Sequence, residues 1–421
     1  MQVQRVSKVN IKPKHEYYDY LKYLCRVSKN LYNTALFIQR QAYFDSRYYK
    51  NYNELDREAR LKTSAMYKYY HILPQQVAQQ TLKVLDKNWK SFFKSNSEYK
   101  KQPNKFTGKP HPPKYLESDS YFNLYITEQS LHYENEKIRV SCLSKLFNEE
   151  LKISTKLSNI ENIIKLNQIR ILPRGNHLIV EIVYIKEIND KKLNGKQVIG
   201  IDIGIDNLLT IIGDTRATIV NGKGLKSINH YYNKKKSAIQ SELKTKQQKE
   251  WSKCLQRLTD KRKNKIEDAF HKISRWLINF CKENEISTIV IGQNKDWKRN
   301  IRLGKVNNQK FTQIPFKRLE QMIEYKGQEA GINIIFQEES YTSKASYFDN
   351  DIIPIYKSKE TKYKFSGQRI KRGLYRTKEG KLINADVNGS LNILRKSKVT
   401  DDVVRPVSIG RVANPVKINI F

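Results

Sequence analysis

Residues 198–204 read VIGIDIG, a short apolar run that carries one carboxylate, Asp202. Such a run favours a buried strand, and because side chains alternate between the two faces of a strand, the isoleucines beside Asp202 point away from it. Gly200 and Gly204 are its neighbours on its own face, where we expect open space for a metal ion and a phosphate backbone. A charge inside an apolar strand is costly unless it is paired or bound to a metal. Asp202 is therefore a candidate site residue, and a strand-end Asp that closes a turn with Gly204 is the alternative.

The residues that follow this strand predict an α/β domain. Apolar runs predict strands at 198–204, 208–213, 216–220, 287–292 and 332–338, and apolar residues at helical spacing predict helices at 233–284, 315–330 and 386–396. Gly331 is suited to end the second of these helices. The order β-β-β-α-β-α-β-α is that of an RNase H-like domain, in which an antiparallel meander continues into parallel strands through crossover helices.

The first half of the chain predicts helices inserted between β segments. Residues 1–13 read as a strand, helical periods cover 15–49 and the residues after Pro74, and residues 99–115 read as an extended basic linker. Residues 169–185, IRILPRGNHLIVEIVYI, contain two β-rich runs around a Pro-Arg-Gly-Asn turn, which favours a hairpin. These β segments could close into one small barrel.

The charge balance limits the classes of partner. The 421 residues include 79 Lys and Arg against 42 Asp and Glu, a net charge of +37, and 38% hydrophobic residues suffice for folded cores. Such a chain attracts polyanions, and nucleic acid is favoured over a membrane because no basic helix has a clean apolar face. No apolar run of about 18 residues predicts a membrane span, and no signal peptide is expected. The four scattered cysteines favour buried thiols over disulfides or a zinc site.

Further carboxylates could complete a site around Asp202. Asp386, in NADVNGSLNIL, opens a predicted helix, where its alternative role is that of an N-cap. A two-metal phosphodiesterase site needs at least three converging carboxylates. In RNase H-like domains the second acid ends the fourth strand, but Gly292 stands at that place. The next strand ends in Glu338 and Glu339, and because neighbouring strands lie about 4.8 Å apart, one of them could reach the same metal pair. A solvated strand end is the alternative for either glutamate.

Several segments carry motifs that occur together in one protein family. They are IGIDIGIDNLLT (199–210), IGQNKDWK (291–298), EESYTSKAS (338–346), FSGQRIKRGLYRTKEGKLINADVNGSLNILRK (365–396) and NPVKI (414–418). Together they resemble the TnpB family (OrfB-type), which are transposon-encoded, RNA-guided DNA nucleases related to the type V CRISPR effectors. SKNLYNTALF (28–37) and GKPHPPKY (108–115) extend a looser resemblance into the first half.

The resemblance implies an α+β multidomain fold. It predicts a β-barrel-like wedge domain at 1–14 and 118–196, a helical recognition insert at 15–117, an RNase H-like (RuvC) α/β nuclease domain at 197–343 and 377–421, and a basic nucleic-acid-loading segment at 344–376. Many relatives carry a CxxC zinc ribbon in the loading segment. Because no cysteine follows residue 282, we expect no zinc here.

The resemblance also implies which residues act. Asp202 and Asp386 match the first and third acids of an Asp-Glu-Asp metal site, and Glu339, with Glu338 as second choice, takes the place of the second. These acids are expected to hold two Mg²⁺ ions, with Mn²⁺ as a possible substitute. The residues expected to contact nucleic acid are Arg369, Lys371, Arg372 and Arg376 in the loading segment and Lys29 and Tyr32 in the first half.

The activity implied is that of an RNA-guided DNA endonuclease. A guide RNA from the transposon end would direct cleavage of double-stranded DNA next to a short flanking motif, by metal-dependent phosphodiester hydrolysis. We expect a cytoplasmic, nucleoid-associated prokaryotic protein without a membrane partner. Two alternatives stay open: a nuclease-dead, RNA-guided DNA-binding repressor, suggested by the missing acid at position 292, and a DNA-joining transposase, since those enzymes also use an RNase H-like carboxylate cluster.

Overall fold

A computed structural model of the chain gives its structure as two compact units, Met1–Ile188 and Asn189–Phe421, and each unit is described by itself. The described residues are 1–134, 137–144, 151–154, 163–188, 193, 195, 197–213, 216–247, 250–293, 313–354, 363–371, 373–399, 412 and 414–421. Within these ranges, no helix combines the length and the apolar character that crossing a lipid bilayer requires.

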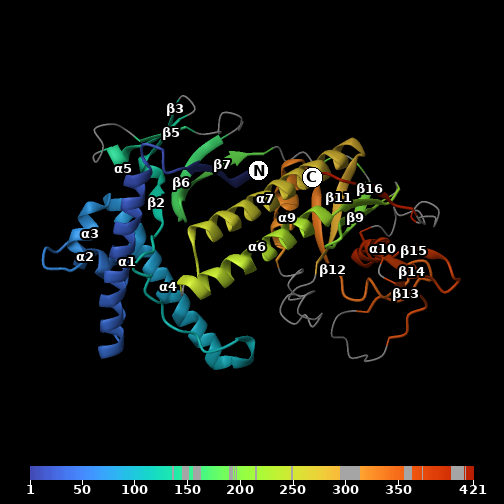
Figure 1. Cartoon of the computed structure of the whole chain (residues 1–421), viewed down its shortest axis with the longest axis horizontal. Coiled ribbons are helices and arrows are strands. Elements are labelled where there is room, and N and C mark those ends of the chain that lie inside the picture. The colour runs from blue at the N-terminus through green and yellow to red at the C-terminus, as the bar shows by residue number, and fades with distance from the viewer. Residues whose placement is uncertain are drawn as a thin grey trace. The chain divides into compact units, whose positions relative to one another are not determined.

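Two antiparallel sheets form the β part of the first unit (Figure 1). The first has the order β1-β7-β6-β2, with β1 (Gln2–Ile11), β2 (Leu124–Thr127), β6 (Ile163–Arg174) and β7 (His177–Glu187). The second contains β3 (Leu131–Glu134), β4 (Lys137–Val140) and β5 (Leu151–Ser154). The predicted hairpin is confirmed, because β6 and β7 pair up to Arg174 opposite His177 and Gly175 turns the chain with φ +53°. Closure of these strands into a barrel stays a prediction.

Helices fill the chain between β1 and β2. They are α1 (Tyr18–Ser46), α2 (Tyr52–Ala59), α3 (Tyr67–Ile72) and α4 (Gln75–Lys101), and α5 (Ser141–Ser144) follows later, with 3-10 turns at Pro103–Lys105 and Glu128–Ser130. The two predicted helices are confirmed as α1 and α4, and Pro74 immediately precedes α4. Their core includes Trp89, whose ring lies 5.2 Å from that of Tyr43. Part of the tyrosine-rich sequence therefore packs the interior of this unit.

A six-stranded sheet is the centre of the second unit. Its order is β12-β11-β8-β9-β10-β16, with β8 (Gln197–Ile203), β9 (Asn207–Ile212), β10 (Thr218–Asn221), β11 (Ile286–Gln293), β12 (Asn333–Glu338) and β16 (Val416–Ile418). Strands β8, β9 and β10 form the predicted antiparallel meander, and β11 runs parallel to both β8 and β12. The NPVKI motif forms β16, which adds to β10 in parallel.

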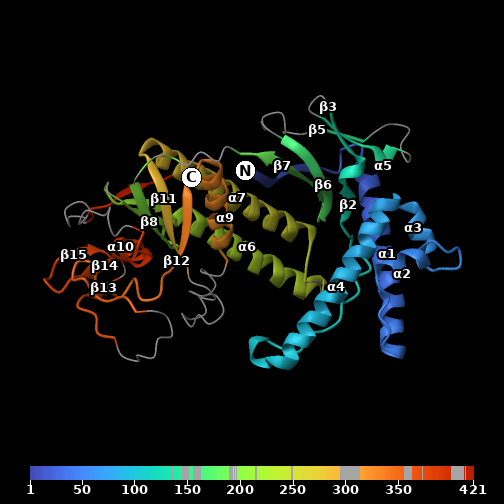
Figure 2. The ribbon, with the colours of Figure 1, turned by 180° about the vertical axis from the view of Figure 1, so that it is seen from behind.

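The helices of the second unit correct one prediction. The stretch predicted as one helix at 233–284 consists of α6 (Lys223–Gln247) and α7 (Lys253–Glu283), which pack side by side (Figures 1 and 2). Apolar and basic residues recur at helical spacing in both helices, so this spacing does not reveal where α6 ends and α7 begins. A cap marks it: the Ser252 side chain accepts a hydrogen bond from the Leu255 amide and starts α7.

The two faces of the six-stranded sheet are covered by different helices. Ile201 of β8 and Ile291 of β11 share a core with α7 and with α9 (Phe316–Glu329). Val290 of β11 packs on the other face against Leu394 of α10 (Ala385–Ser397). Because side chains alternate along a strand, Asp202 lies on the α10 face, opposite Ile201, as its place in the sequence predicts.

A small sheet that the sequence did not predict precedes α10. It consists of β13 (Gln368–Lys371), β14 (Leu374–Arg376) and β15 (Leu382–Asn384). The buried Tyr375 holds it to the preceding loop by donating to the carbonyl oxygen of Lys344 at 2.8 Å. The domain limits inferred from the sequence stay a prediction.

Candidate active site

Gly200, two residues before Asp202 on the same face of β8, is covered by helix α10. The open space expected beside Asp202 at this glycine is therefore absent. A Cβ atom at Gly200 would lie 2.8 Å from the carbonyl oxygen of Ser390 and 3.0 Å from Cβ of Leu394, so α10 packs directly on this glycine. The Ser390 hydroxyl donates to the Gly200 carbonyl at 2.9 Å, which fixes the helix there. As a result, Gly389 of α10 faces Asp202, and a Cβ on it would be 3.3 Å from Asp202 Oδ2.

Glu339 occupies the place at which the sequence lacks an acid. Gly292 near the end of β11 stands where the second carboxylate was expected, and a Cβ atom on it would lie 2.7 Å from Oε2 of Glu339. The Glu339 carboxylate, which follows β12, therefore lies over the end of the neighbouring strand. The turn after it is fixed by Thr342, whose hydroxyl donates to the Glu339 carbonyl oxygen at 2.8 Å.

Glu338 has a different environment. Its Oε2 atom accepts from the Lys396 ammonium at 2.6 Å, and its Oε1 atom accepts from the Ser340 amide at 2.7 Å. Burial alone would raise the pKa of Glu338, but these hydrogen bonds and the charge of Lys396 lower it overall. Both of its oxygens therefore serve an ion pair and a turn.

Asp386 is not the N-cap of its helix. That position belongs to Asn384, whose side chain accepts from the amides of Asp386 and Val387. The Asp386 carboxylate is thereby available to other partners: Oδ2 accepts from Asn207 Nδ2 at 2.7 Å, and Oδ1 accepts from the Arg369 guanidinium at 3.3 Å. The alternative role considered for this residue is thus ruled out by a neighbour two positions earlier.

The three acids interact electrostatically. Burial raises the pKa of Asp202 well above its ordinary value, and the negative charges of Glu339 and Asp386 raise it further. Arg369 acts in the opposite direction but only in part. Asp202 is therefore buried close enough to two other carboxylates for their charges to act on it.

The chemistry of these donors suits a hard cation. Carboxylate oxygens are the ligands that Mg²⁺ prefers, and a bound cation would favour the charged form of the buried Asp202 carboxylate. As the side chains stand, no group of three or more His, Cys, Asp and Glu residues within the described ranges encloses a metal position. The Arg369 guanidinium instead binds Asp386 Oδ1, so a metal ion at that oxygen would have to displace it.

Two residues expected to contact nucleic acid are buried. Lys29 donates to the carbonyl oxygen of Ser118 at 3.1 Å, and the ring of Tyr32 packs at a tilt against that of Phe122, with the ring centres 4.8 Å apart. Neither side chain is accessible in this structure, because the buried face of α1 is wider than the apolar residues alone indicate. The expectation for both is therefore corrected to a packing role.

The basic residues of the loading segment have different positions. Arg369 and Lys371 lie on β13 and Arg376 lies on β14, and all three are exposed. Arg369 reaches Asp386, so β13 borders the acidic cluster. Arg372 lies outside the described residues.

Sequence reasoning missed the residues that hold the acids in place. Asn207 binds Asp386 from the start of β9, and Lys396 holds Glu338 from the end of α10. Both lie within the motifs quoted above, at IDN (205–207) and LRK (394–396), but nothing in their spacing says which acid each one contacts. Such contacts join residues far apart in the chain and need the fold to be found.

Comparison with known proteins gives two family matches, both between residues 180 and 393. A model described as OrfB_IS605, probable transposase, matches residues 180–298, and a Cas12f1-like TNB domain model matches residues 316–393. The chain is 27% identical over 247 residues to TnpB-like protein ORF457 of Acidianus two-tailed virus, covering 55% of this chain and 50% of that protein. It is 26% identical over 168 residues to TnpB-like protein MJ0751 of Methanocaldococcus jannaschii, covering 39% of this chain and 59% of that protein. The chain thus matches between half and three fifths of the length of these two relatives.

A solved structure supports the fold. The protein in a Cas12f1–sgRNA–target DNA complex superposes with a TM-score of 0.52 at 14% identity, over 89% of this chain and 82% of that chain. Identity this low is informative about the fold alone. The mixed α/β, multidomain class predicted from the sequence is confirmed by this likeness and by the two units of the structure.

Proposed function

The chain belongs to the TnpB family, and we propose that it is an RNA-guided nuclease that cuts double-stranded DNA. The observation that carries this proposal is the placement of Asp202, Glu339 and Asp386 on one face of an RNase H-like sheet, close enough for the charges of the last two to act on Asp202. Three carboxylates so arranged suit phosphodiester hydrolysis by two metal ions. The exposed Arg369 of β13, which contacts Asp386, suits a substrate with a phosphate backbone.

In this proposal three acids share the binding of metal, and Glu338 does not take part. Asp202, Glu339 and Asp386 would hold two Mg²⁺ ions, or Mn²⁺ in their place, and the bound metal would activate water and stabilise the leaving oxygen. Because ligating carboxylates bind a metal in their charged form, the raised pKa of Asp202 would make metal binding dependent on pH. Asn207 orients Asp386 by its 2.7 Å hydrogen bond, and Glu338 stays with Lys396.

The exposed basic residues of β13 and β14 suit the role of guiding DNA to these acids. Arg369 lies at the carboxylate of Asp386, and Lys371 and Arg376 are exposed on the same small sheet. Contacts to phosphate position a strand without reading its sequence. A net charge of +37 further supports a large polyanionic partner, which we propose is a guide RNA from the transposon end. Base pairing with that RNA would then supply the sequence specificity.

An amide-lined cleft in the first unit suits the reading of a short flanking motif. It has a volume of about 660 Å³ and lies among α4, the segment after β2, and β6. Its side chains include Gln79, Gln80, Gln129 and Gln168, and amide side chains recognise base edges, adenine above all, by paired hydrogen bonds. We expect Gln79→Ala and Gln80→Ala to weaken the preference for particular flanking bases, while DNA with the preferred flanking motif is still cut.

The proposal is tested by sequencing the small RNA that copurifies with the full chain. We expect one dominant RNA species whose addition to RNA-stripped protein restores cutting of a matched duplex in Mg²⁺. Stable binding to the matched duplex without any cut strand would favour the repressor instead. Joining of DNA ends in the absence of RNA would favour the transposase.

A further inference from the structure

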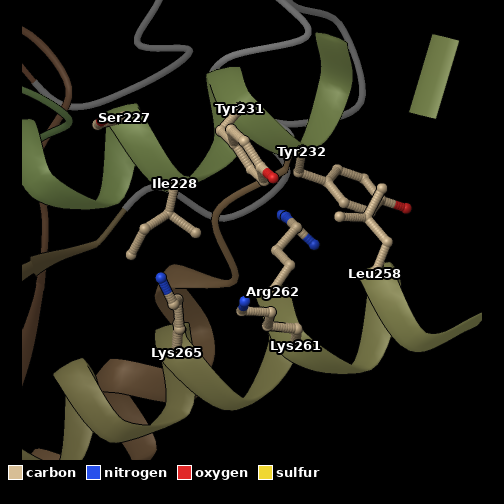
Figure 3. Close-up of a pocket in the computed structure, with 8 residues that line it drawn as sticks. All are labelled: Ser227, Ile228, Tyr231, Tyr232, Leu258, Lys261, Arg262 and Lys265. Carbon is tan, nitrogen blue, oxygen red and sulfur yellow. The ribbon is translucent and has the colours of Figure 1, made fainter. Parts of the chain in front are cut away.

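A pocket lies between α6 and α7, away from the acidic site. It has a volume of about 290 Å³ and is lined by Ser227, Ile228, Tyr231, Tyr232, Leu258, Lys261, Arg262 and Lys265. Figure 3 shows Ile228 and Tyr231 of α6 pointing toward α7, and Arg262 and Lys265 of α7 pointing toward α6, while Lys261 lies along α7 beside them. Both groups follow helical spacing, so each helix contributes one continuous face to the pocket. None of the eight lining residues is a carboxylate.

The inner wall of the pocket is fixed by hydrogen bonds. The Arg262 guanidinium donates to Asn229 Oδ1 and to the carbonyl oxygen of Gln313, both at 2.6 Å, and it lies 5.0 Å from the ring centre of Tyr232. These partners are neutral, so they leave the positive charge of Arg262 uncompensated. Burial lowers the pKa of Arg262, which is the cost of keeping this charge away from water.

The outer wall combines an exposed ring with two lysines. Tyr231 is 57% exposed, whereas Tyr232 beside it is buried. Lys261 and Lys265 are one helical turn apart on α7, where two like charges destabilise a helix. Neither lysine has an ion-pair partner among the residues that the structure describes. An anion bound between them would relieve this repulsion.

We propose that this α6–α7 pocket binds one unstacked nucleotide of an RNA strand, with its base on Tyr231 and its phosphate between Lys261 and Lys265. The volume of about 290 Å³ lies just below the roughly 300–1,000 Å³ of small-ligand sites, which suits a ligand no larger than a single nucleotide. Aromatic rings stack on bases of any sequence, and unstacked bases occur in the loops and bulges of RNA. The assignment of RNA as the bound strand rests on the proposed function. The assignment of a base to Tyr231 and of a phosphate to the two lysines rests on the pocket itself.

A site-resolved measurement is needed, because other surfaces of a protein with a net charge of +37 also bind RNA. The probe is single-stranded polyuridine that contains 5-bromouridine, bound to the full chain without Mg²⁺ and cross-linked by ultraviolet light. We expect a cross-linked peptide that contains Tyr231. Tyr231→Ala should weaken binding at this site roughly 5- to 100-fold, and Tyr231→Phe should keep it, since stacking needs only the ring. Melting temperatures establish that each variant is folded.

A matched pair of double variants separates the pocket from bulk electrostatics. Lys261→Gln with Lys265→Gln removes two charges inside the pocket, and Lys253→Gln with Arg257→Gln removes two exposed charges of the same helix outside it. We expect the first pair to abolish the Tyr231 cross-link and the second to leave most of it. An equal loss of the Tyr231 cross-link in both double variants, or an unchanged cross-link in the Lys261 and Lys265 variant, would overturn the assignment of the binding site to this pocket. An equally strong cross-link to single-stranded DNA, or tighter binding of free uridine monophosphate, would overturn the assignment to an RNA strand. The assay involves no cutting, so a failure of the nuclease proposal leaves its result unaffected.

Discussion

Glu338 and Glu339 are adjacent, yet the structure gives them opposite environments, and two single substitutions should separate them. Glu339→Gln removes a charge that lies over Gly292 and acts on Asp202. Glu338→Gln removes the partner of Lys396 and leaves that charge in place. The two substitutions are chemically identical and one residue apart, so each is the control for the other.

The expected loss of stability can be worked out for Glu338→Gln. A hydrogen bond between charged groups contributes about 1.5–3 kcal/mol, and the Lys396 side chain is only 11% exposed. The Glu338 side chain is 37% exposed, so solvent screening reduces the expected loss to about 1–2 kcal/mol. For a unit of this size that corresponds to a fall in melting temperature of about 2–8 °C. Cutting should continue at nearly the wild-type rate.

Glu339→Gln should have the reverse effect. Without a metal the melting temperature should stay the same or rise, because a negative charge that repels Asp202 is gone. Cutting should fall roughly 100- to 1,000-fold, the rate equivalent of the few kcal/mol that a metal ligand supplies. The assays are metal-free thermal melting and single-turnover cleavage of a guide-matched duplex. Equal cutting by the two variants, or loss of cutting in Glu338→Gln alone, would refute the assignment of the second acid.

Three further predictions follow from the same geometry and charge. Gly292→Ala should reduce cutting because the new Cβ would lie 2.7 Å from Glu339 Oε2, whereas Gly108→Ala, with no atom within 4 Å, should not; equal rates would contradict this. The pKa of Asp202 is higher in the folded chain than in the unfolded chain, where an Asp releases its proton above about pH 4. Between these two pKa values the folded state binds more protons, so the free energy of unfolding falls as the pH rises. Asp202→Asn in metal-free buffer should therefore raise the melting temperature at neutral pH, with a gain that shrinks toward pH ~4, and a fall would count against the shift. RNA binding should weaken steeply with salt: each neutralised phosphate should add about 0.7–0.9 to the negative slope of log binding constant against log salt concentration. RNA-free protein should also be poorly soluble at low salt, and a stable RNA-free preparation there would contradict this prediction.

The parts of the fold that could be predicted are those set by local periodicity. The alternation around Asp202 gives its strand and its face, and the Pro-Arg-Gly-Asn segment gives the hairpin of β6 and β7. The helices α1, α4, α9 and α10 follow from their apolar spacing. In each case neighbouring residues alone decide the structure.

The parts that could not be predicted depend on contacts between distant segments. Gly200 reads as open space in the sequence, but α10 fills that space, and only this packing brings Asp386 near Asp202. Helix caps also decide two features that the apolar spacing does not show. Ser252 caps the start of α7, and Asn384, not Asp386, is the N-cap of α10. The burial of Lys29 was missed for the same reason, since its carbonyl partner lies 89 residues away.

We propose that RNA-directed cutting of DNA occurs at the Asp202, Glu339 and Asp386 cluster. Cleavage of two duplexes, one matched to the copurifying RNA and one scrambled, should be measured in Mg²⁺ for the protein–RNA complex and for its Asp386→Asn variant. Asp386→Asn keeps the side-chain shape and the neighbouring Asn384 cap while removing the charge. We predict that only the wild-type complex cuts, and only the matched duplex. Cutting of the scrambled duplex, or undiminished cutting by the variant, would contradict the account.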